Sequence, residues 1–240
     1  MQYLICFDMD RVLVDHMSTW QYVYDRLKIS NEEAFNLYNQ GKLDEWDWLK
    51  MDLGMIKRAY PEITDQKMRE LCEGTPLMAG INECLQWIFD EGHEVAIISG
   101  GMQETARDIA CMFPSEKPWR RRWGGINRHR GMDTRFHVFT NGWLERNDGS
   151  IDDYGRYQVQ MNGKGSIVKM LQRRLGIPKE RTISIGDSAG DIGMFQESGL
   201  SICFNPWDEK PVAVAKMTIR SRNLLDVLEA IKKQIKSYSN

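Results

Sequence analysis

The chain has 240 residues, a length that suits one large domain or a domain that carries an insertion. Its 32 Lys and Arg residues nearly balance its 34 Asp and Glu residues, so the formal net charge is −2 and the composition excludes a polybasic or acidic disordered protein. A hydrophobic fraction of 42%, with eight Trp, eight Tyr and eight Phe, is too high for intrinsic disorder, and we expect a globular fold.

No apolar run approaches the roughly 18 residues that a membrane helix needs, and the apolar run at residues 4–7 is too short for a secretory signal. We therefore expect a cytoplasmic protein without membrane association. The five cysteines form no Cys-x-x-Cys pair and lie mostly in apolar stretches. We expect buried thiols rather than disulfides or zinc ligands.

The first predicted strand spans residues 3–7, and the segment after it has several helical patterns but no convincing strand. We interpret residues 15–78 as an inserted helical domain, which leaves residues 1–14 and 79–240 as the core domain. Because the insert departs directly after a strand, its helices are expected to cover the carboxyl ends of the strands as a lid.

Beyond the insert, strand and helix patterns alternate, which predicts a parallel α/β sheet. Further apolar runs at residues 94–98, 182–185 and 200–204 are typical of strands buried on both faces. Amphipathic helices are predicted at residues 81–89, 166–175 and 224–235. Between residues 136–140 and 143–146, the dipeptide Asn141-Gly142 predicts a β-hairpin.

Paired carboxylates follow two of the predicted strands. Asp8 and Asp10 come directly after the first strand, and Asp187 and Asp191 follow the strand at residues 182–185. Like charges this close are costly unless they share a proton or a cation, and carboxylate oxygens suit a hard cation. Each pair alone could simply cap a turn.

Two further signals suit the binding of an anion. Ser99 and Gly100 follow the strand at residues 94–98, where a hydroxyl and free backbone amides can approach a phosphate closely. Lys164 lies between two glycines before a helix and can supply a point charge, although most single lysines are merely exposed. All these motifs fall at or beyond the carboxyl ends of predicted parallel strands, and so many coincidences indicate one shared site.

In their order and spacing these motifs resemble those of the haloacid dehalogenase superfamily of phosphohydrolases. The Ser99 motif, the Asp148-Gly149 turn and the glycines around Lys164 are similar to the phosphoserine-phosphatase-like branch. The resemblance implies a Rossmann-like parallel sheet core with an inserted helical cap of the C1 type. It also implies a Mg²⁺-dependent phosphatase that hydrolyses the phosphomonoester of a small phosphorylated metabolite through an aspartyl-phosphate intermediate.

The same resemblance implies a role for each motif residue. Asp8 would be the nucleophile and Asp10 the general acid and base. Ser99, the Gly100 amide and Lys164 would hold the phosphoryl oxygens. The Mg²⁺ site would comprise Asp8, Asp10 through its main-chain carbonyl, Asp187 and Asp191, the last binding the metal's waters or fixing the lysine.

We do not infer from the resemblance that this chain acts on phosphoserine, the substrate of that branch. Phosphoserine phosphatases hold the amino and carboxylate groups of their substrate with a glutamate beyond the first motif and an arginine in the cap. Here the first position reads His16-Met17-Ser18, and the cap stretch at residues 44–52 has no arginine. The aromatic residues of the cap are more often core than binding surface, but a pocket lined by them would favour an apolar or ring-bearing leaving group.

Three interpretations remain open for residues 117–135, which hold seven Lys and Arg residues and one Asp. They could form a solvated loop, an anion-binding flap, or a contact with RNA, and we rank them in that order. We do not expect nucleic acid as a partner. The alternatives to hydrolysis are a phosphotransferase of the same fold and a non-catalytic anion- or RNA-binding protein, although a binding module has no use for both Asp8 and Asp10.

Overall fold

The computed structural model describes residues 1–113 and 135–237. Within them, parallel strands form one sheet in the order β3-β2-β1-β4-β5-β6. The strands are β1 (Leu4–Phe7), β2 (Glu94–Met102), β3 (Phe136–Asn141), β4 (Thr182–Gly186), β5 (Leu200–Phe204) and β6 (Met217–Ile219). The predicted parallel α/β sheet is confirmed. The edge strand β6 was not predicted, because its three residues are mostly exposed and form no apolar run.

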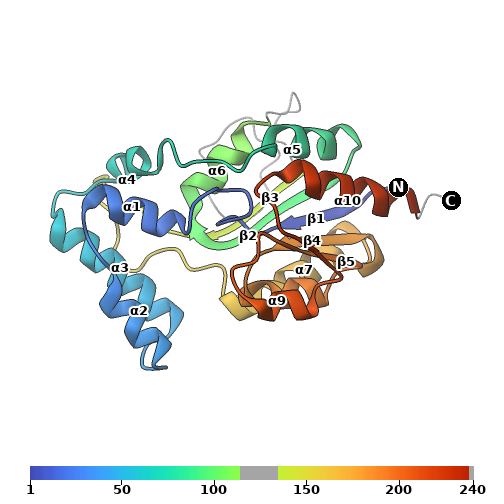
Figure 1. Cartoon of the computed structure of the whole chain (residues 1–240). Helices are drawn as coiled ribbons and strands as arrows, with labels where there is room; N and C mark the ends of the chain where they lie inside the picture. The colour runs from blue at the N-terminus through green and yellow to red at the C-terminus, as the bar shows by residue number, and fades with distance from the viewer. Residues whose placement is uncertain (114–134, 238–240) are drawn as a thin grey trace.

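Helices cover both faces of the sheet (Figure 1). Alternate strand residues point to opposite faces, so Ile5 and Phe7 pack on one side while Leu4 and Cys6 pack on the other. The first face carries α5 (Ile81–Asp90), α6 (Gln103–Cys111) and α10 (Leu224–Ser237). The second carries α7 (Lys164–Leu175) and α8 (Ile192–Gln196), and α9 (Glu209–Val214) packs beside α8. Burial on both faces explains why these strands are continuous apolar runs.

The strand order fixes where a ligand can bind. From β1 the chain builds outward through β2 and β3, and then returns to place β4 on the other side of β1. Connections therefore leave β1 and β4 in opposite directions, which opens a crevice at their carboxyl ends. Asp8 follows β1, and its backbone N–H donates to the carbonyl of Ile185 in β4 at 2.9 Å.

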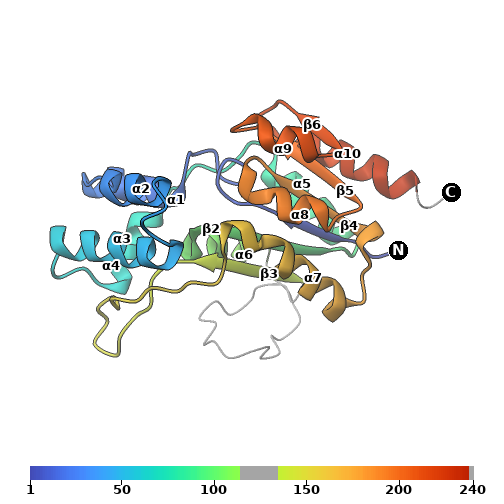
Figure 2. The ribbon, with the colours of Figure 1, turned by 90° about the horizontal axis from the view of Figure 1, so that it is seen from below.

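The segment between β1 and α5 forms α1 (Thr19–Leu27), α2 (Glu32–Asn39), α3 (Glu45–Ala59) and α4 (Asp65–Cys72). Oxygen side chains start three of these helices: Ser18, Asp44 and Thr64 each accept a hydrogen bond from a backbone N–H in the first turn. The four helices group at the carboxyl end of the sheet (Figure 2). Residues of α1, α3 and α4 form a hydrophobic cluster that is distinct from the clusters on the two sheet faces.

Two connections from the sheet domain reach these helices. The two ends of the helical segment run side by side, with an isolated bridge between Val14 and Leu77. In addition, the loop after β3 contributes Trp143 and Ile151 to the hydrophobic cluster of α1, α3 and α4. Beside it, the N–H of Asp65 at the start of α4 donates to the carbonyl of Gly149 at 2.9 Å. The helical segment is therefore joined to the rest of the chain at its two ends and also packs against the loop that follows β3.

The predicted hairpin at Asn141-Gly142 is wrong. Asn141 is the last residue of β3, which pairs in parallel with β2, so the chain cannot reverse there. It reverses at residues 146–150, where the N–H of Arg146 donates to the carbonyl of Ser150 at 2.8 Å and Gly149 has a φ of 85°. The side-chain oxygen of Asn141 instead accepts from the N–H of Val159 at 2.9 Å. Long-range strand pairing has overridden a local turn signal.

Most of the basic stretch, residues 117–134, lies outside the described residues, so its three interpretations stay open. Arg135 is described: it donates to the carbonyl of Phe89 at 2.7 Å and lies over the ring of that residue. All five cysteines are free; four of them are buried, as expected, and Cys111 is half-buried. Among the helices of the described ranges, none combines the length and apolarity needed to cross a bilayer.

The hydrophobic cluster of α1, α3 and α4 should be sensitive to loss of volume. Leu53 is fully buried in α3 at the centre of this cluster. We expect Leu53→Ala to lower the free energy of unfolding by about 2–5 kcal/mol, because the cavity does not collapse completely. Denaturant unfolding measures this. The control Met170→Ala, at an exposed position of α7, should change it by less than about 0.5 kcal/mol; equal effects would contradict the assignment of Leu53 to a packed core.

Candidate active site

A buried lysine links carboxylates from two strands. Oδ1 of Asp8 accepts from the N–H of Met9 at 2.8 Å and from Nζ of Lys164 at 2.9 Å. The same Nζ donates to Oδ1 of Asp191 at 2.7 Å. Lys164 is the first residue of α7, so the helix aims its side chain at the carboxyl ends of β1 and β4. The structure thus brings together three residues that lie far apart in the sequence.

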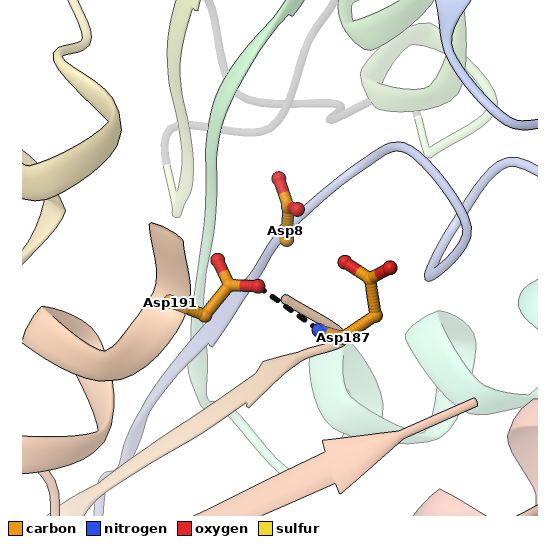
Figure 3. A group of neighbouring side chains, drawn as sticks. All are labelled: Asp8, Asp187 and Asp191. Atoms are coloured by element: carbon orange, nitrogen blue, oxygen red, sulfur yellow. Dashed lines mark hydrogen bonds between the residues drawn. The ribbon is translucent and has the colours of Figure 1, made fainter. Parts of the chain in front are cut away.

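Asp191 accepts hydrogen bonds from groups that surround the site. Its second oxygen, Oδ2, accepts from the N–H of Asp187 at 2.9 Å and from that of Ser188 at 3.1 Å. Figure 3 shows the first of these bonds, with the carboxylates of Asp8 and Asp187 facing a shared space. A Cβ at Gly186 would overlap the side chain of Asp191. The glycine before the carboxylate pair is therefore required by this close approach.

Arg11 was missed by sequence reasoning, although it follows Asp10 directly. Its Nε lies 2.9 Å from Oδ2 of Asp187, and Nη2 donates to the carbonyl of Asn205 at 3.0 Å. Its guanidinium lies over the ring of Trp207 at 5.0 Å. The backbone of Arg11 has a φ of 62°, a conformation that costs energy for a non-glycine residue. The one sequence feature that could have indicated its role was a basic residue directly after two carboxylates at the end of a strand.

Asp10 points toward the helical segment rather than toward Lys164. Its Oδ1 accepts from the N–H of Thr19, the first residue of α1, at 2.9 Å. Oγ1 of Thr19 in turn accepts from the N–H of Met102 at 2.8 Å. The positive end of the α1 helix dipole also favours a carboxylate here. Removal from water, and secondarily the charge of Asp8, raise the pKa of Asp10 to about 7.

Ser99 and the two glycines after it lie within β2, where the pairing with β3 is irregular between Ser99 and Met102. The hydroxyl of Ser99 is buried and accepts from the N–H of Gly101 at 3.1 Å. The carbonyl of Gly100 accepts from Nε1 of Trp20 at 3.0 Å. A Cβ at Gly101 would press on Thr19 and Asp10. This end of β2 is therefore packed directly against Asp10.

The electrostatics of the site favour a bound cation. Burial is the largest effect on Asp8 and raises its pKa, and the nearby Lys164 opposes this. Burial and then the charge of Asp8 raise the pKa of Asp187 to about 8. For Lys164, burial acts to lower the pKa, but the charges of Asp191 and Asp8 outweigh it and raise the pKa. A bound cation would stabilise the charged forms of these carboxylates, which burial and mutual repulsion disfavour.

The donor set fits a hard divalent cation. Asp8, Asp187 and Asp191 each offer an oxygen, and these three oxygens lie within 4.8 Å of one another. Both oxygens of Asp191 already accept hydrogen bonds, which leaves Asp8 and Asp187 as the better direct ligands. An all-oxygen set suits Mg²⁺ or Ca²⁺ rather than a softer metal.

One cavity of about 480 Å³ lies between these carboxylates and the four helices. The candidate residues Asp8, Asp10, Ser99, Gly100, Lys164 and Asp187 all line it, whereas Asp191 lies behind Lys164 and does not. From the helical segment, Met17, Trp20, Tyr24, Trp48 and Asp52 line the opposite wall. His16 does not line this cavity as the described residues form it, and its ring packs against Tyr22 instead. Sequence reasoning missed Asp52, because the residue looks like any other helical acid.

Comparisons with known proteins agree with this architecture. A family model described as haloacid dehalogenase-like hydrolase matches residues 159–231. A phosphoserine phosphatase of Methanocaldococcus jannaschii is 28% identical over 236 residues, covering 95% of this chain and 97% of the relative. One from Campylobacter jejuni is 27% identical over 164 residues, covering 68% of each chain. A solved structure of a phospho-aspartyl intermediate analogue of phosphoserine phosphatase superposes with a TM-score of 0.73 at 22% identity, covering 95% and 98% of the two chains.

Proposed function

We propose that this chain hydrolyses a small phosphorylated metabolite through an aspartyl phosphate on Asp8, with Mg²⁺ as cofactor. The proposal starts from its place among the haloacid dehalogenase-like hydrolases, as a phosphatase similar to the phosphoserine phosphatases. The observation that carries the proposal is that Asp8 and Asp10 line one cavity, with Lys164 bonded to Asp8. This arrangement supports the assignment of Asp8 as nucleophile, Asp10 as acid and Lys164 as phosphate-binding cation.

In the first step, Asp8 attacks the phosphorus of the substrate. Both described contacts of Asp8 fall on Oδ1, so we assign the attack to Oδ2. The new bond joins Oδ2 to phosphorus, the ester P–O bond breaks, and the leaving oxygen takes a proton from Asp10. A pKa near 7 lets Asp10 carry that proton at neutral pH.

In the second step, Asp10 takes a proton from water while the water oxygen bonds to phosphorus. The bond between phosphorus and Asp8 breaks, which releases phosphate and restores the carboxylate. Lys164, the hydroxyl of Ser99 and the backbone amide of Gly100 are the donors that we assign to the phosphoryl oxygens. Lys164 needs no rearrangement for this role, since Asp191 already holds it at the cavity.

We assign the Mg²⁺ site to the carboxylates of Asp8 and Asp187 and the main-chain carbonyl of Asp10, with Asp191 fixing Lys164 behind them. When bound, the metal offsets the repulsion between the carboxylates and the phosphate dianion. Arg11, which pairs with Asp187, limits the negative charge at the same carboxylate. The donors are oxygens of the type that Mg²⁺ prefers.

We further propose that residues 15–78 act as a cap domain that closes over the active site and selects the leaving group. The supporting observations are their separate hydrophobic cluster and the side chains they contribute to the wall opposite Asp8. Residues 1–14 and 79–240 then form the core that carries out the chemistry.

The metal assignment predicts a defined response to chelation. Phosphate release from p-nitrophenyl phosphate should cease in excess EDTA and return when Mg²⁺ is added. Asp187→Asn should raise the Mg²⁺ concentration for half-maximal activity by about tenfold or more, because a charged ligand is lost. The control Asp226→Asn changes an exposed carboxylate on α10 and should leave this concentration unchanged. Full activity in the chelator would contradict the proposed function.

A further inference from the structure

The wall of the cavity opposite the phosphoryl site carries a buried carboxylate. Asp52 lies on α3, is 6% exposed and lines the same cavity as Asp8. Its Oδ1 is buried and has no hydrogen-bond partner among the described residues. Tyr24, Asn31 and Trp48 lie close enough to act on this carboxylate, yet the Tyr24 hydroxyl and Nε1 of Trp48 are themselves buried without a partner. A buried acceptor in this state is costly unless a ligand completes it.

The surrounding side chains are aromatic. Trp20, Tyr24, Phe35 and Trp48 all line the cavity together with Asp52. The rings of Trp20 and Tyr24 lie 6.3 Å apart, and those of Phe35 and Trp48 lie 6.1 Å apart. Aromatic faces beside a carboxylate are the chemistry that attracts an organic cation. The aromatic residues of the helical segment therefore form part of the cavity wall as well as of a core.

The charges along the cavity separate into two ends. Within the described residues, the basic side chains that line it are Arg11 and Lys164, and both already pair with carboxylates at the phosphoryl end. The wall from α3 instead carries two acids, Glu45 and Asp52, which lie seven residues apart and so on one face of the helix. Glu45 accepts from the N–H of Met161 at 2.9 Å. Asp52 is the acid that retains an unfilled acceptor.

Building on the proposed function, we infer that the leaving group of the substrate carries a positively charged ammonium group, which Asp52 and the surrounding rings bind. The substrate is then the phosphate monoester of an amino alcohol without a carboxylate. Removal from water raises the pKa of Asp52 to about 7, and Tyr24, Asn31 and Trp48 oppose this only in part; a bound cation would restore its charge. A carboxylate on the leaving group would face like charge at this wall, which disfavours phosphoserine.

Steady-state kinetics of the Mg²⁺-loaded protein test this inference. The probes are O-phosphoethanolamine and phosphocholine, which distinguish a primary from a quaternary ammonium, together with the neutral isostere 3,3-dimethylbutyl phosphate and phosphoserine. We expect kcat/KM for at least one ammonium ester to exceed that for the neutral isostere and for phosphoserine by about tenfold or more, mainly through KM. A ratio near one, or a preference for phosphoserine, would overturn the inference.

A variant separates binding from folding. Asp52→Asn should lower the ratio of kcat/KM for the ammonium ester to that for the neutral isostere by about tenfold. A purely structural role for Asp52 would lower both values together and leave the ratio unchanged, which would contradict us. The control Asp47→Asn, at an exposed position of the same helix, should not change the ratio.

Binding without turnover gives an independent readout. Asp8→Asn protein should bind the preferred ammonium ester about tenfold or more tightly than 3,3-dimethylbutyl phosphate, followed by the fluorescence of the tryptophans in the cavity wall. Equal affinities would overturn the inference even if the enzyme is an active phosphatase. Conversely, a failure of the wild type to release phosphate from p-nitrophenyl phosphate contradicts the proposed function, while the affinity ratio still decides whether Asp52 binds an ammonium group.

Discussion

Asp8→Asn should abolish phosphate release, with kcat reduced by at least about 10⁴-fold, while the protein still folds and binds substrate. An asparagine has nearly the same shape as aspartate, but its amide cannot attack phosphorus to form an acyl phosphate. We expect Lys164 to keep its hydrogen bond to Asp191 in this variant, so the cation that we assign to phosphate binding stays in place. The loss therefore isolates nucleophilic attack from the other contributions to catalysis.

The stability of the same variant should not fall. Burial raises the pKa of Asp8, which means that folding disfavours its charged form, and a neutral asparagine removes that cost. We expect an unchanged or higher Tm by differential scanning calorimetry. Asp8→Ala should show the same loss of turnover, which excludes deamidation as a source of residual activity. Asp90→Asn, an exposed acid on α5, is the matched control; substantial turnover by either Asp8 variant would reject the aspartyl-phosphate route.

Asp10→Asn should produce a defect that depends on the leaving group. Alkyl phosphates need a proton on their leaving oxygen, so formation of the phosphoenzyme should slow by about 10²–10⁴-fold. Aryl phosphates such as p-nitrophenyl phosphate leave as stable phenolates and need little help. We therefore expect a rapid burst of p-nitrophenol in stopped-flow experiments, followed by slow turnover, because water now lacks its general base.

The comparison between ester types decides the role of Asp10. With alkyl phosphates the variant should show neither a burst nor measurable steady-state release. Equal losses of burst rate for alkyl and aryl esters would argue that Asp10 holds α1 in place, through its bond to the N–H of Thr19, rather than donating a proton. Asp15→Asn serves as the control, since Asp15 follows the same strand but pairs with Arg222 and does not line the cavity built by the described residues.

The sequence was sufficient to predict the parallel sheet and where its motifs meet. Strands buried on both faces are continuous apolar runs, and parallel strands present their carboxyl ends at one edge. Residues at the carboxyl ends of such strands, such as Asp8 after β1, Ser99 within the last residues of β2 and Asp187 after β4, are therefore neighbours in space whatever their separation in sequence. Three helices of the core, α5, α7 and α10, were equally predictable from their amphipathic periods, whereas α6, α8 and α9 were not predicted. The local hydrophobic pattern predicts the strands, and the common direction of the strands predicts that their motifs meet.

Other features were decided only by tertiary packing. Arg11 pairs with Asp187, 176 positions away, and no local pattern could reveal this contact. Asn141 has the sequence signature of a turn, yet parallel pairing with β2 keeps it in a strand. Asp52 is one of several acids in residues 44–52, and only the packing of α3 makes it the buried one that lines the cavity. Periodicity gives the face of a helix or strand that is buried, but what that face meets depends on long-range contacts that no local window contains.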